Sequence, residues 1–90
     1  MIVEFDPAKD VANQAKHGVS LQLGEAVFAD PQHLIVTTVR PQDGEARSKV
    51  IGRAHGELRT AVFVRRGEAV RFIGVRRSND KEARAYSRRP

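Results

Sequence analysis

The sequence predicts an α+β domain of two layers, with helices packed on an antiparallel sheet. Residues 7–29 carry apolar side chains at helical spacing, whereas residues 34–77 consist of β-branched runs separated by short turns. A capped helical segment follows and ends at Tyr86. The chain has 90 residues, which is enough for one modest core, so residues 1–90 are expected to form a single domain.

The N-terminal segment is predicted to form a strand and then a helix. Residues 2–6 alternate apolar and acidic side chains, which is typical of a short strand. Asp6 can cap a helix in which Pro7 takes the first position, where a missing N–H costs nothing, and Gly18 can end it. Four apolar residues share one face of this helix and are expected to be buried: Ala8, Val11, Ala12 and Ala15.

The opposite face of this helix is a polar stripe of Lys9, Asn13, Lys16 and His17. Such a stripe could line a groove for an RNA backbone, with His17 as proton donor or acceptor because the usual pKa of imidazole lies near neutrality. A solvated face is the alternative, since Lys16 and His17 in the last turn also favour the negative end of the helix dipole in any protein.

A second helix is predicted to begin at Ser20, which can act as its N-cap, and to end before Asp30 and Pro31. Its expected buried edge includes Leu23 and Val27. Because only a short connection separates the two helices, we expect an antiparallel pair that together covers one face of the sheet.

Four strands are expected after the helices, at residues 34–39, 47–54, 58–65 and 69–77. The expected turns are residues 41–45, His55–Gly56 and Arg66–Gly67. Short turns between consecutive strands indicate antiparallel neighbours, and so a four-strand meander. We expect the N-terminal strand to lie with the helix pair in the layer packed on this meander.

The last strand and the helix after it hold most of the groups that could do chemistry. Regular alternation would place Val70, Phe72, Gly74 and Arg76 on one side and Arg71, Ile73, Val75 and Arg77 on the other. The two adjacent arginines are therefore expected to face opposite ways.

The helix after this strand should begin with a capping box formed by Asn79 and Glu82, and Tyr86 then shares a helical face with Glu82. An arginine, a carboxylate and a phenol at one strand-to-helix corner suit a phosphate-binding site. A purely structural interpretation also fits, in which Arg76 is a solvated strand-end charge, Glu82 only caps the helix and Tyr86 anchors it to the sheet.

The charge balance points to an anionic partner. Sixteen Lys and Arg residues exceed eleven Asp and Glu residues, which gives a net charge of +5 and a pI near 10.4. Twelve of the sixteen are arginine, whose planar fork binds phosphate with two hydrogen bonds, so RNA, a phosphate-bearing substrate or an acidic protein would each fit.

Other classes of protein are disfavoured by the composition. The chain has no cysteine, and His17, His33 and His55 lack the spacing of metal ligands, so we expect no metal and no cofactor. No apolar run is long enough to span a membrane and no signal peptide is evident, so the expected location is the cytoplasm.

The residues also resemble a known family. FDPAKDVANQAKHGVS, EAVFADP, VIGRA and RFIGVRR, followed by the capped Glu82 and Tyr86, are similar to the BrnT toxins of bacterial type II toxin–antitoxin modules. The resemblance covers most of the chain, and the run from Lys9 to Gly18 is its most specific part. There are two departures: Phe5 stands where the family often has tryptophan, and Gly74–Val75 stands where Ser-Ala is commoner.

The resemblance implies a RelE-like fold and an endoribonuclease that stops translation until a cognate BrnA-like antitoxin binds. DNA would then be reached only indirectly, through the antitoxin, and a homodimer within the complex is allowed. The implied functional residues are Lys9, Asn13, Lys16, His17, Arg76, Glu82 and Tyr86, to which we add Arg47 and Arg77 as RNA-binding candidates.

The chemistry expected for such a site needs no metal. The 2′-hydroxyl of RNA would attack the neighbouring phosphate, Arg76 would stabilise the added charge with Arg47 and Lys16, and Glu82 or His17 would accept the proton. Tyr86 would stack on a base or donate a hydrogen bond to phosphate. The main alternative is a non-catalytic protein, either a basic RNA-binding module or a toxin relic that acts only with its antitoxin on DNA.

Overall fold

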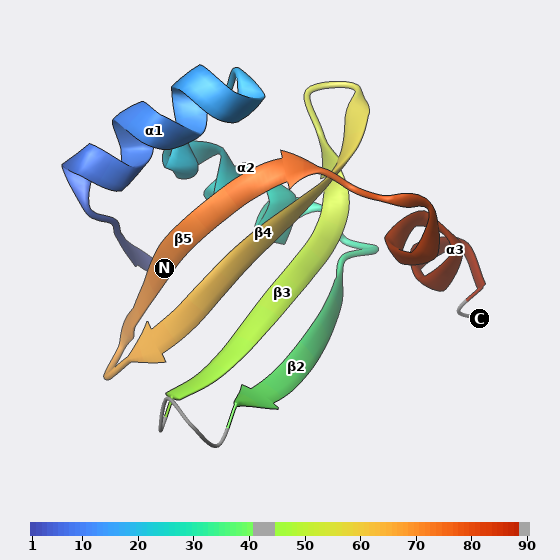
Figure 1. Cartoon of the computed structure of the whole chain (residues 1–90). Helices are drawn as coiled ribbons and strands as arrows, with labels where there is room; N and C mark the ends of the chain where they lie inside the picture. The colour runs from blue at the N-terminus through green and yellow to red at the C-terminus, as the bar shows by residue number, and fades with distance from the viewer. Residues whose placement is uncertain (41–44, 89–90) are drawn as a thin grey trace.

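The computed structural model describes residues 1–40 and 45–88, and side chains are described except at residues 38–45. The elements are β1 (Ile2–Glu4), α1 (Pro7–His17), the 3₁₀ helix η1 (Leu21–Leu23), α2 (Gly24–Ala29), β2 (Leu34–Arg40), β3 (Glu45–Ala54), β4 (Glu57–Arg66), β5 (Ala69–Arg77) and α3 (Asp80–Arg88). Figure 1 shows one curved sheet with α1 and α3 at its two ends. The predicted turn at residues 41–45 lies almost wholly outside the described residues.

The sheet confirms the antiparallel meander and adds a fifth strand to it. The strand order is β1-β5-β4-β3-β2, and β2 to β5 pair with their sequence neighbours in antiparallel fashion. β1 pairs with β5 in parallel, with Ile2 opposite Ala69, so the sheet is mixed. The prediction treated this N-terminal strand as part of the helical layer, and that was wrong.

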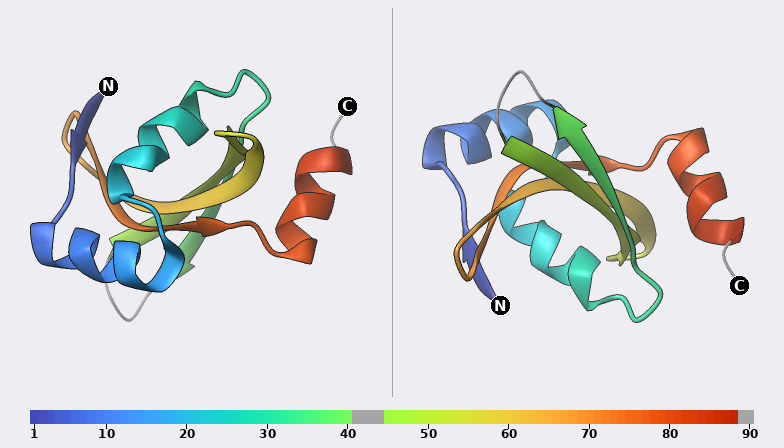
Figure 2. Two further views of the ribbon diagram at one scale, coloured as in Figure 1. Left: turned by 90° about the horizontal axis from the view of Figure 1, so that it is seen from above. Right: turned by 90° about the horizontal axis from the view of Figure 1, so that it is seen from below.

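The two N-terminal helices do not form a pair on one face. Figure 2 shows α1 and α2 on opposite sides of the sheet. We call the side covered by η1 and α2 the back face, and the opposite side, which carries Lys49, Thr60 and Arg76 and is turned to the viewer in Figure 1, the front face. The predicted second helix is also divided, because η1 ends at Leu23 and α2 begins at Gly24.

The core lies between the back face and α2. Phe63 and Phe72 are fully buried there, and Phe28 of α2 packs edge-on against Phe63 with ring centroids 5.0 Å apart. Gly24 and Gly52 permit this close approach: a Cβ on Gly24 would lie 2.5 Å from the Phe72 ring, and one on Gly52 would lie 2.6 Å from a backbone oxygen of α2. The buried cluster is completed by Leu21, Val27, Val50, Ala54, Ala61, Val70 and Val75.

The predicted caps of α1 and α3 are confirmed, although α3 continues to Arg88, two residues beyond the predicted end at Tyr86. Asp6 accepts a hydrogen bond from the Ala8 N–H, and Gly18 ends α1 in the left-handed conformation. At α3, Asn79 and Glu82 each accept a hydrogen bond from the other's backbone N–H, which is the expected capping box.

The predicted buried face of α1 is wrong. Within α1, Asn13 is the buried residue, whereas Val11 is 68% exposed and Ala8, Ala12 and Ala15 also face solvent. The spacing of apolar residues was correct as a helix signal, but it identified the outer face.

Among the described residues, no helix is long and apolar enough to cross a membrane.

The predicted alternation along β5 holds only as far as Phe72. Phe63 pairs with Phe72 and Val62 pairs with Gly74, so Ile73 is an extra residue in a β-bulge. Beyond the bulge the sides are exchanged, which puts Val75 in the core with Phe72 and turns Arg76 to the front face.

Candidate functional site

α1 and β5 enclose a groove at the edge of the front face. It has a volume of about 340 Å³ and is lined by Lys9, Ala12, Asn13, Lys16, His17, Ile73 and Gly74. The predicted polar stripe therefore does line a groove. Lys9, Lys16 and His17 are exposed along its rim, while Asn13 lies at its base.

Asn13 is a structural member of this groove. Its amide nitrogen donates to the carbonyls of Val19 and Val75, and its amide oxygen accepts a hydrogen bond from the Val75 N–H. These three bonds fix α1 to β5 and to the loop after α1. Because both of its amide hydrogens are used in this way, Asn13 holds α1, and with it Lys9 and Lys16, in place against β5.

A second cluster lies beside the groove on the front face and is centred on Glu82. The guanidinium of Arg76 donates to both carboxylate oxygens of Glu82, at 2.7 and 2.9 Å. Glu82 also accepts hydrogen bonds from Lys49 Nζ at 2.8 Å and Thr60 Oγ1 at 3.0 Å, besides the Asn79 N–H. The carboxylate is 2% exposed, whereas the side chains of Arg76 and Lys49 are about one-third exposed.

These contacts determine the protonation state of the cluster. Burial opposes ionisation of Glu82, but the hydrogen bonds from Arg76, Lys49, Asn79 and Thr60 outweigh it and hold the pKa of its carboxyl far below the usual range. The same hydrogen bond to Glu82 raises the pKa of Arg76. Glu82 is therefore a fixed anion at neutral pH, with donors on both of its oxygens.

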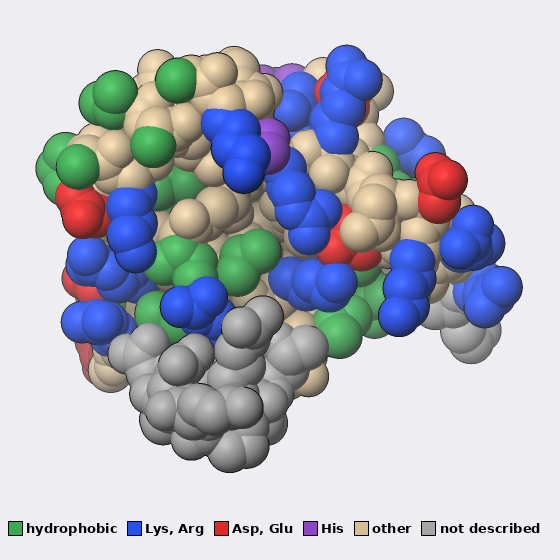
Figure 3. All heavy atoms as spheres, in the orientation of Figure 1, with side chains coloured by type: hydrophobic (Ala, Val, Ile, Leu, Met, Phe, Trp, Pro, Cys, Tyr) green, Lys and Arg blue, Asp and Glu red, His purple; other side chains and the backbone are tan. Residues whose placement is uncertain are grey.

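The groove and the Glu82 cluster adjoin. Gly74 lines the groove, and Arg76 is two residues further on the same side of β5, a distance of about 7 Å along a strand. Figure 3 shows lysine and arginine side chains gathered over this face between α1 and α3, around an apolar floor. A polyanion lying across the front face would therefore meet several cations.

The other predicted site residues are placed differently. Arg77 faces away from Arg76, as expected, and pairs with Glu57 at 2.6 Å. Tyr86 shares a face of α3 with Glu82, but its hydroxyl donates to Asp30 Oδ2 at 2.7 Å and Arg53 lies 6.0 Å from its ring centroid. This geometry supports the anchoring interpretation of Tyr86. Arg47 is two residues before Lys49 on β3 and so lies on the same side of that strand.

The sequence interpretation missed Lys49 and Thr60. Each lies in the middle of a strand, where Lys49 alternates with the buried Val50 and Thr60 precedes the buried Ala61. A lysine in the middle of a strand was the available signal, since a partly buried lysine is usually paired with an anion. Its partner lies 33 residues away, and spacing along the chain does not reveal that.

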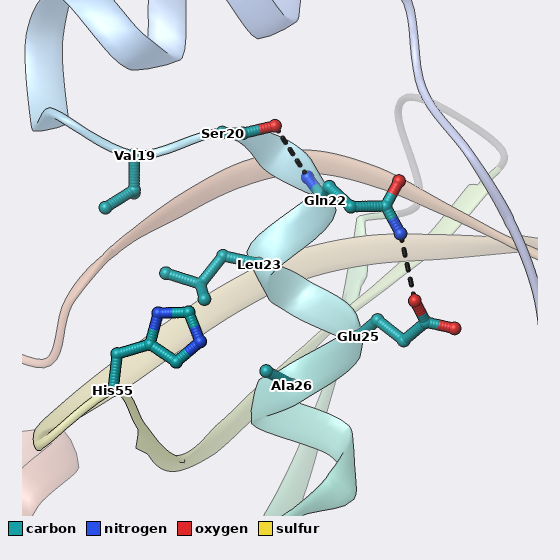
Figure 4. A pocket seen from close by; sticks show the side chains of 7 residues that line it. All are labelled: Val19, Ser20, Gln22, Leu23, Glu25, Ala26 and His55. Carbon is teal, nitrogen blue, oxygen red and sulfur yellow. Dashed lines mark hydrogen bonds between the residues drawn. The ribbon is translucent and has the colours of Figure 1, made fainter.

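A second hollow lies on the back face and has a volume of about 420 Å³. Figure 4 shows the His55 ring beside Leu23, with Gln22 donating to Glu25 at the rim. His55 has a positive φ of 51° in the β3–β4 turn, followed by Gly56 at 81°, which is a normal conformation for a two-residue hairpin. Among the described residues that line this hollow, none belongs to the predicted site.

Comparison with known families decides the assignment. The family described as the ribonuclease toxin BrnT of type II toxin–antitoxin systems matches residues 5–82. The chain belongs to the BrnT family. The match spans α1, the front-face strands and Glu82, and thus both the groove and the cluster. No curated protein matches the sequence significantly.

The family is described as a ribonuclease toxin of type II toxin–antitoxin systems, and this description implies an RNA target and an antitoxin partner. The basic front face fits such a target. Within the described residues, no group of three or more His, Asp or Glu side chains is arranged to hold a metal ion.

Proposed function

We propose that this BrnT-family toxin is an endoribonuclease that cuts RNA without a metal, at the junction of the α1 groove and the Glu82 cluster. The observation that carries the proposal is the position of Arg76. Two hydrogen bonds to Glu82 hold its guanidinium, while about one-third of its side chain stays exposed. It lies directly beside a groove rimmed by Lys9, Lys16 and His17. An arginine fixed in this way can receive a phosphate without first being ordered.

The proposed reaction uses the RNA's own nucleophile. The 2′-hydroxyl attacks the adjacent phosphorus, the bond to the 5′-oxygen breaks, and that oxygen takes up a proton from water. The products end in a 2′,3′-cyclic phosphate and a 5′-hydroxyl. Arg76 stabilises the extra negative charge of the phosphorane, assisted by Lys16 and Arg47, while His17 accepts the 2′-hydroxyl proton.

Glu82 is better suited to positioning than to proton transfer. Its carboxylate accepts hydrogen bonds on both oxygens and its pKa is strongly lowered, so it is a weak base, and it is not among the residues that line the groove. His17 is exposed on the rim of the groove, where an RNA strand could reach it. Of the two proton acceptors that the sequence suggested, the geometry favours His17.

We further propose that a BrnA-like antitoxin neutralises the toxin in the cytoplasm and is its only link to DNA. The family description supports the existence of a protein partner. The net charge of +5 fits a partner segment rich in Asp and Glu, which would compete with RNA for the front face.

The deciding experiment is incubation of antitoxin-free protein with end-labelled RNA in EDTA, with mapping of the product ends. We expect cyclic phosphate ends, loss of cleavage in Arg76→Ala, and normal cleavage in Arg84→Ala, which removes an exposed arginine of α3 as a matched control. Melting curves of both variants establish that they are folded.

Other outcomes would overturn the proposal. Products with 3′-hydroxyl ends, or cleavage that stops in EDTA, would indicate a different reaction. Salt-sensitive RNA binding without cleavage would instead favour the non-catalytic RNA-binding module.

A further inference from the structure

Lys49 belongs to the Glu82 cluster and also begins a row of three residues that crosses the sheet to the α1 groove. Across the sheet, Lys49 of β3 pairs with Val62 of β4, and Val62 pairs with Gly74 of β5, which lines the groove. The three residues form one row on the front face. Since neighbouring strands are about 4.8 Å apart, the row spans about 10 Å between its outer Cα atoms.

Lys49 and Arg76 share one oxygen of the buried carboxylate. Lys49 Nζ and Arg76 Nη2 donate to the same Glu82 oxygen, at 2.8 and 2.9 Å, so these two nitrogens lie within about 6 Å of each other. Two donors at this separation can bind different oxygens of one phosphate. Glu82 thus holds two cations in a fixed arrangement.

The cluster keeps a surplus of positive charge after its internal pairing. Two cations surround one anion, and the anion is 2% exposed while Lys49 and Arg76 are 30% and 32% exposed. An ammonium has three donors, and the contact with Glu82 uses one of those of Lys49. The side of the cluster that faces solvent is therefore cationic.

We propose that Lys49 contacts the same RNA phosphate as Arg76, so that Glu82, Arg76 and Lys49 form a two-cation phosphate-binding site. This inference rests on the function proposed above. Gly74 leaves open space where the row meets the α1 groove, because a Cβ built on it would meet no atom within 4 Å. One strand of RNA can then lie across the row, from Lys49 to the lysines of α1.

The test measures binding of an RNA whose 2′-hydroxyls are methylated, so that it cannot be cut, over a range of salt concentrations. For Lys49→Met we expect the affinity for RNA to fall about tenfold. The slope of the logarithm of the association constant against the logarithm of the salt concentration should become shallower by about 0.7, the value for one phosphate contact on single-stranded nucleic acid. Lys49→Arg should keep most of the slope. Lys81→Met removes an exposed lysine of α3 and should change neither quantity.

The outcomes separate a phosphate contact from a structural role. If Lys49→Met lowers the melting temperature but leaves the salt slope unchanged, Lys49 only supports Glu82 and the inference is wrong. An equal change in Lys81→Met would show a bulk charge effect, which also overturns it.

The same experiment distinguishes failure of this inference from failure of the proposed function. A wild-type protein that cuts unmodified RNA, combined with an unchanged slope in Lys49→Met, rejects the role of Lys49 alone. A wild-type protein that neither binds nor cuts RNA rejects both.

Discussion

Asn13 does for α1 what an apolar side chain does for most surface helices: it fixes the helix to the sheet. Its three hydrogen bonds reach the backbone of β5 and of the loop after α1, whereas Val11 and the alanines of α1 face solvent. Buried amides are stable only when their donors and acceptors are paired, and here they are. The position of Lys9, Lys16 and His17 therefore depends on one side chain.

We predict that Asn13→Ala lowers the free energy of unfolding by about 2 kcal/mol, because three hydrogen bonds are lost and the Val75 N–H is left without its partner. Asn13→Asp should cost more, since a carboxylate would face two carbonyl oxygens. Urea unfolding measures both changes.

Val11→Ala is the control for this prediction. Val11 is 68% exposed, so the substitution should change the free energy of unfolding by no more than about 0.5 kcal/mol. A larger loss for Val11→Ala than for Asn13→Ala would mean that α1 packs through its apolar face after all.

At the scale of elements, β5 joins the core to the front face through its bulge. Ile73 is the extra residue, and because of it both Phe72 and Val75 point into the core while Gly74 and Arg76 point to the front. Two glycines of the sheet, on strands separated by β4, then have opposite uses. Gly52 of β3 faces α2 closely, whereas Gly74 of β5 faces the open groove.

We predict that Gly52→Ala destabilises the fold by about 2 kcal/mol, since its Cβ would lie 2.6 Å from the Val27 carbonyl oxygen and the backbone must shift. Gly74→Ser should be accommodated within about 0.5 kcal/mol, because its Cβ enters open space. Thermal unfolding of the pair gives the comparison, and similar losses at both sites would contradict the assigned faces.

Gly74→Ser also restores the residue that is commoner in the family at this position of β5. The added hydroxyl would stand in the groove, two residues from Arg76, where it can donate to phosphate. We expect the rate of RNA cleavage to rise a few-fold or stay unchanged, as measured in single-turnover assays. A tenfold fall would show that the groove needs the bare floor that glycine provides.

The sequence predicted what depends on local chemistry. The helix caps depend on contacts within a few residues, and three of them were predicted, at Asp6, Gly18 and Asn79. The polar stripe on α1 depends on helical spacing alone and was also predicted. Burial of Asn13 in place of Val11, and the bulge at Ile73, depend on partners that arrive from distant parts of the chain. For the same reason the Arg76–Glu82 pair, six residues apart, was within reach of sequence reasoning and Lys49 was not.

At the scale of the whole molecule, three carboxylates join helices to segments that are distant in the sequence. Asp10 of α1 accepts hydrogen bonds from Leu21 and Ser20, and Glu82 ties α3 to three strands. Asp30, at the end of α2, accepts hydrogen bonds from the Arg53 N–H and the Tyr86 hydroxyl. These bonds add to the apolar packing of α2 on the sheet and to the hydrogen bonds of Asn13 that hold α1.

The pKa of each of these carboxyls is lowered in the folded state. For Asp10 the main cause is the hydrogen bond from the Leu21 N–H, and for Asp30 it is the one from the Arg53 N–H. For Glu82, burial raises the pKa but the hydrogen bonds from Arg76 and its other donors lower it more. Protons therefore bind more tightly to the unfolded chain than to the folded one.

The free energy of unfolding should accordingly be greatest above about pH 5. It should fall as the pH drops through 4.5 and 3.8, the ordinary pKa values of the Glu and Asp carboxyls, because the unfolded state takes up protons there first.

Glu82→Gln tests the part of this pH dependence that comes from Glu82. At pH 7 this substitution should lower the free energy of unfolding by about 3 kcal/mol, since Arg76 and Lys49 lose their buried anion. At pH 3.5 the difference between wild type and variant should narrow by about 1 kcal/mol, as the wild-type advantage from the lowered pKa of Glu82 is partly lost. Urea unfolding at the two pH values measures this, and a difference that stays constant or widens in acid would mean that Glu82 does not bind Arg76 and Lys49 as an anion.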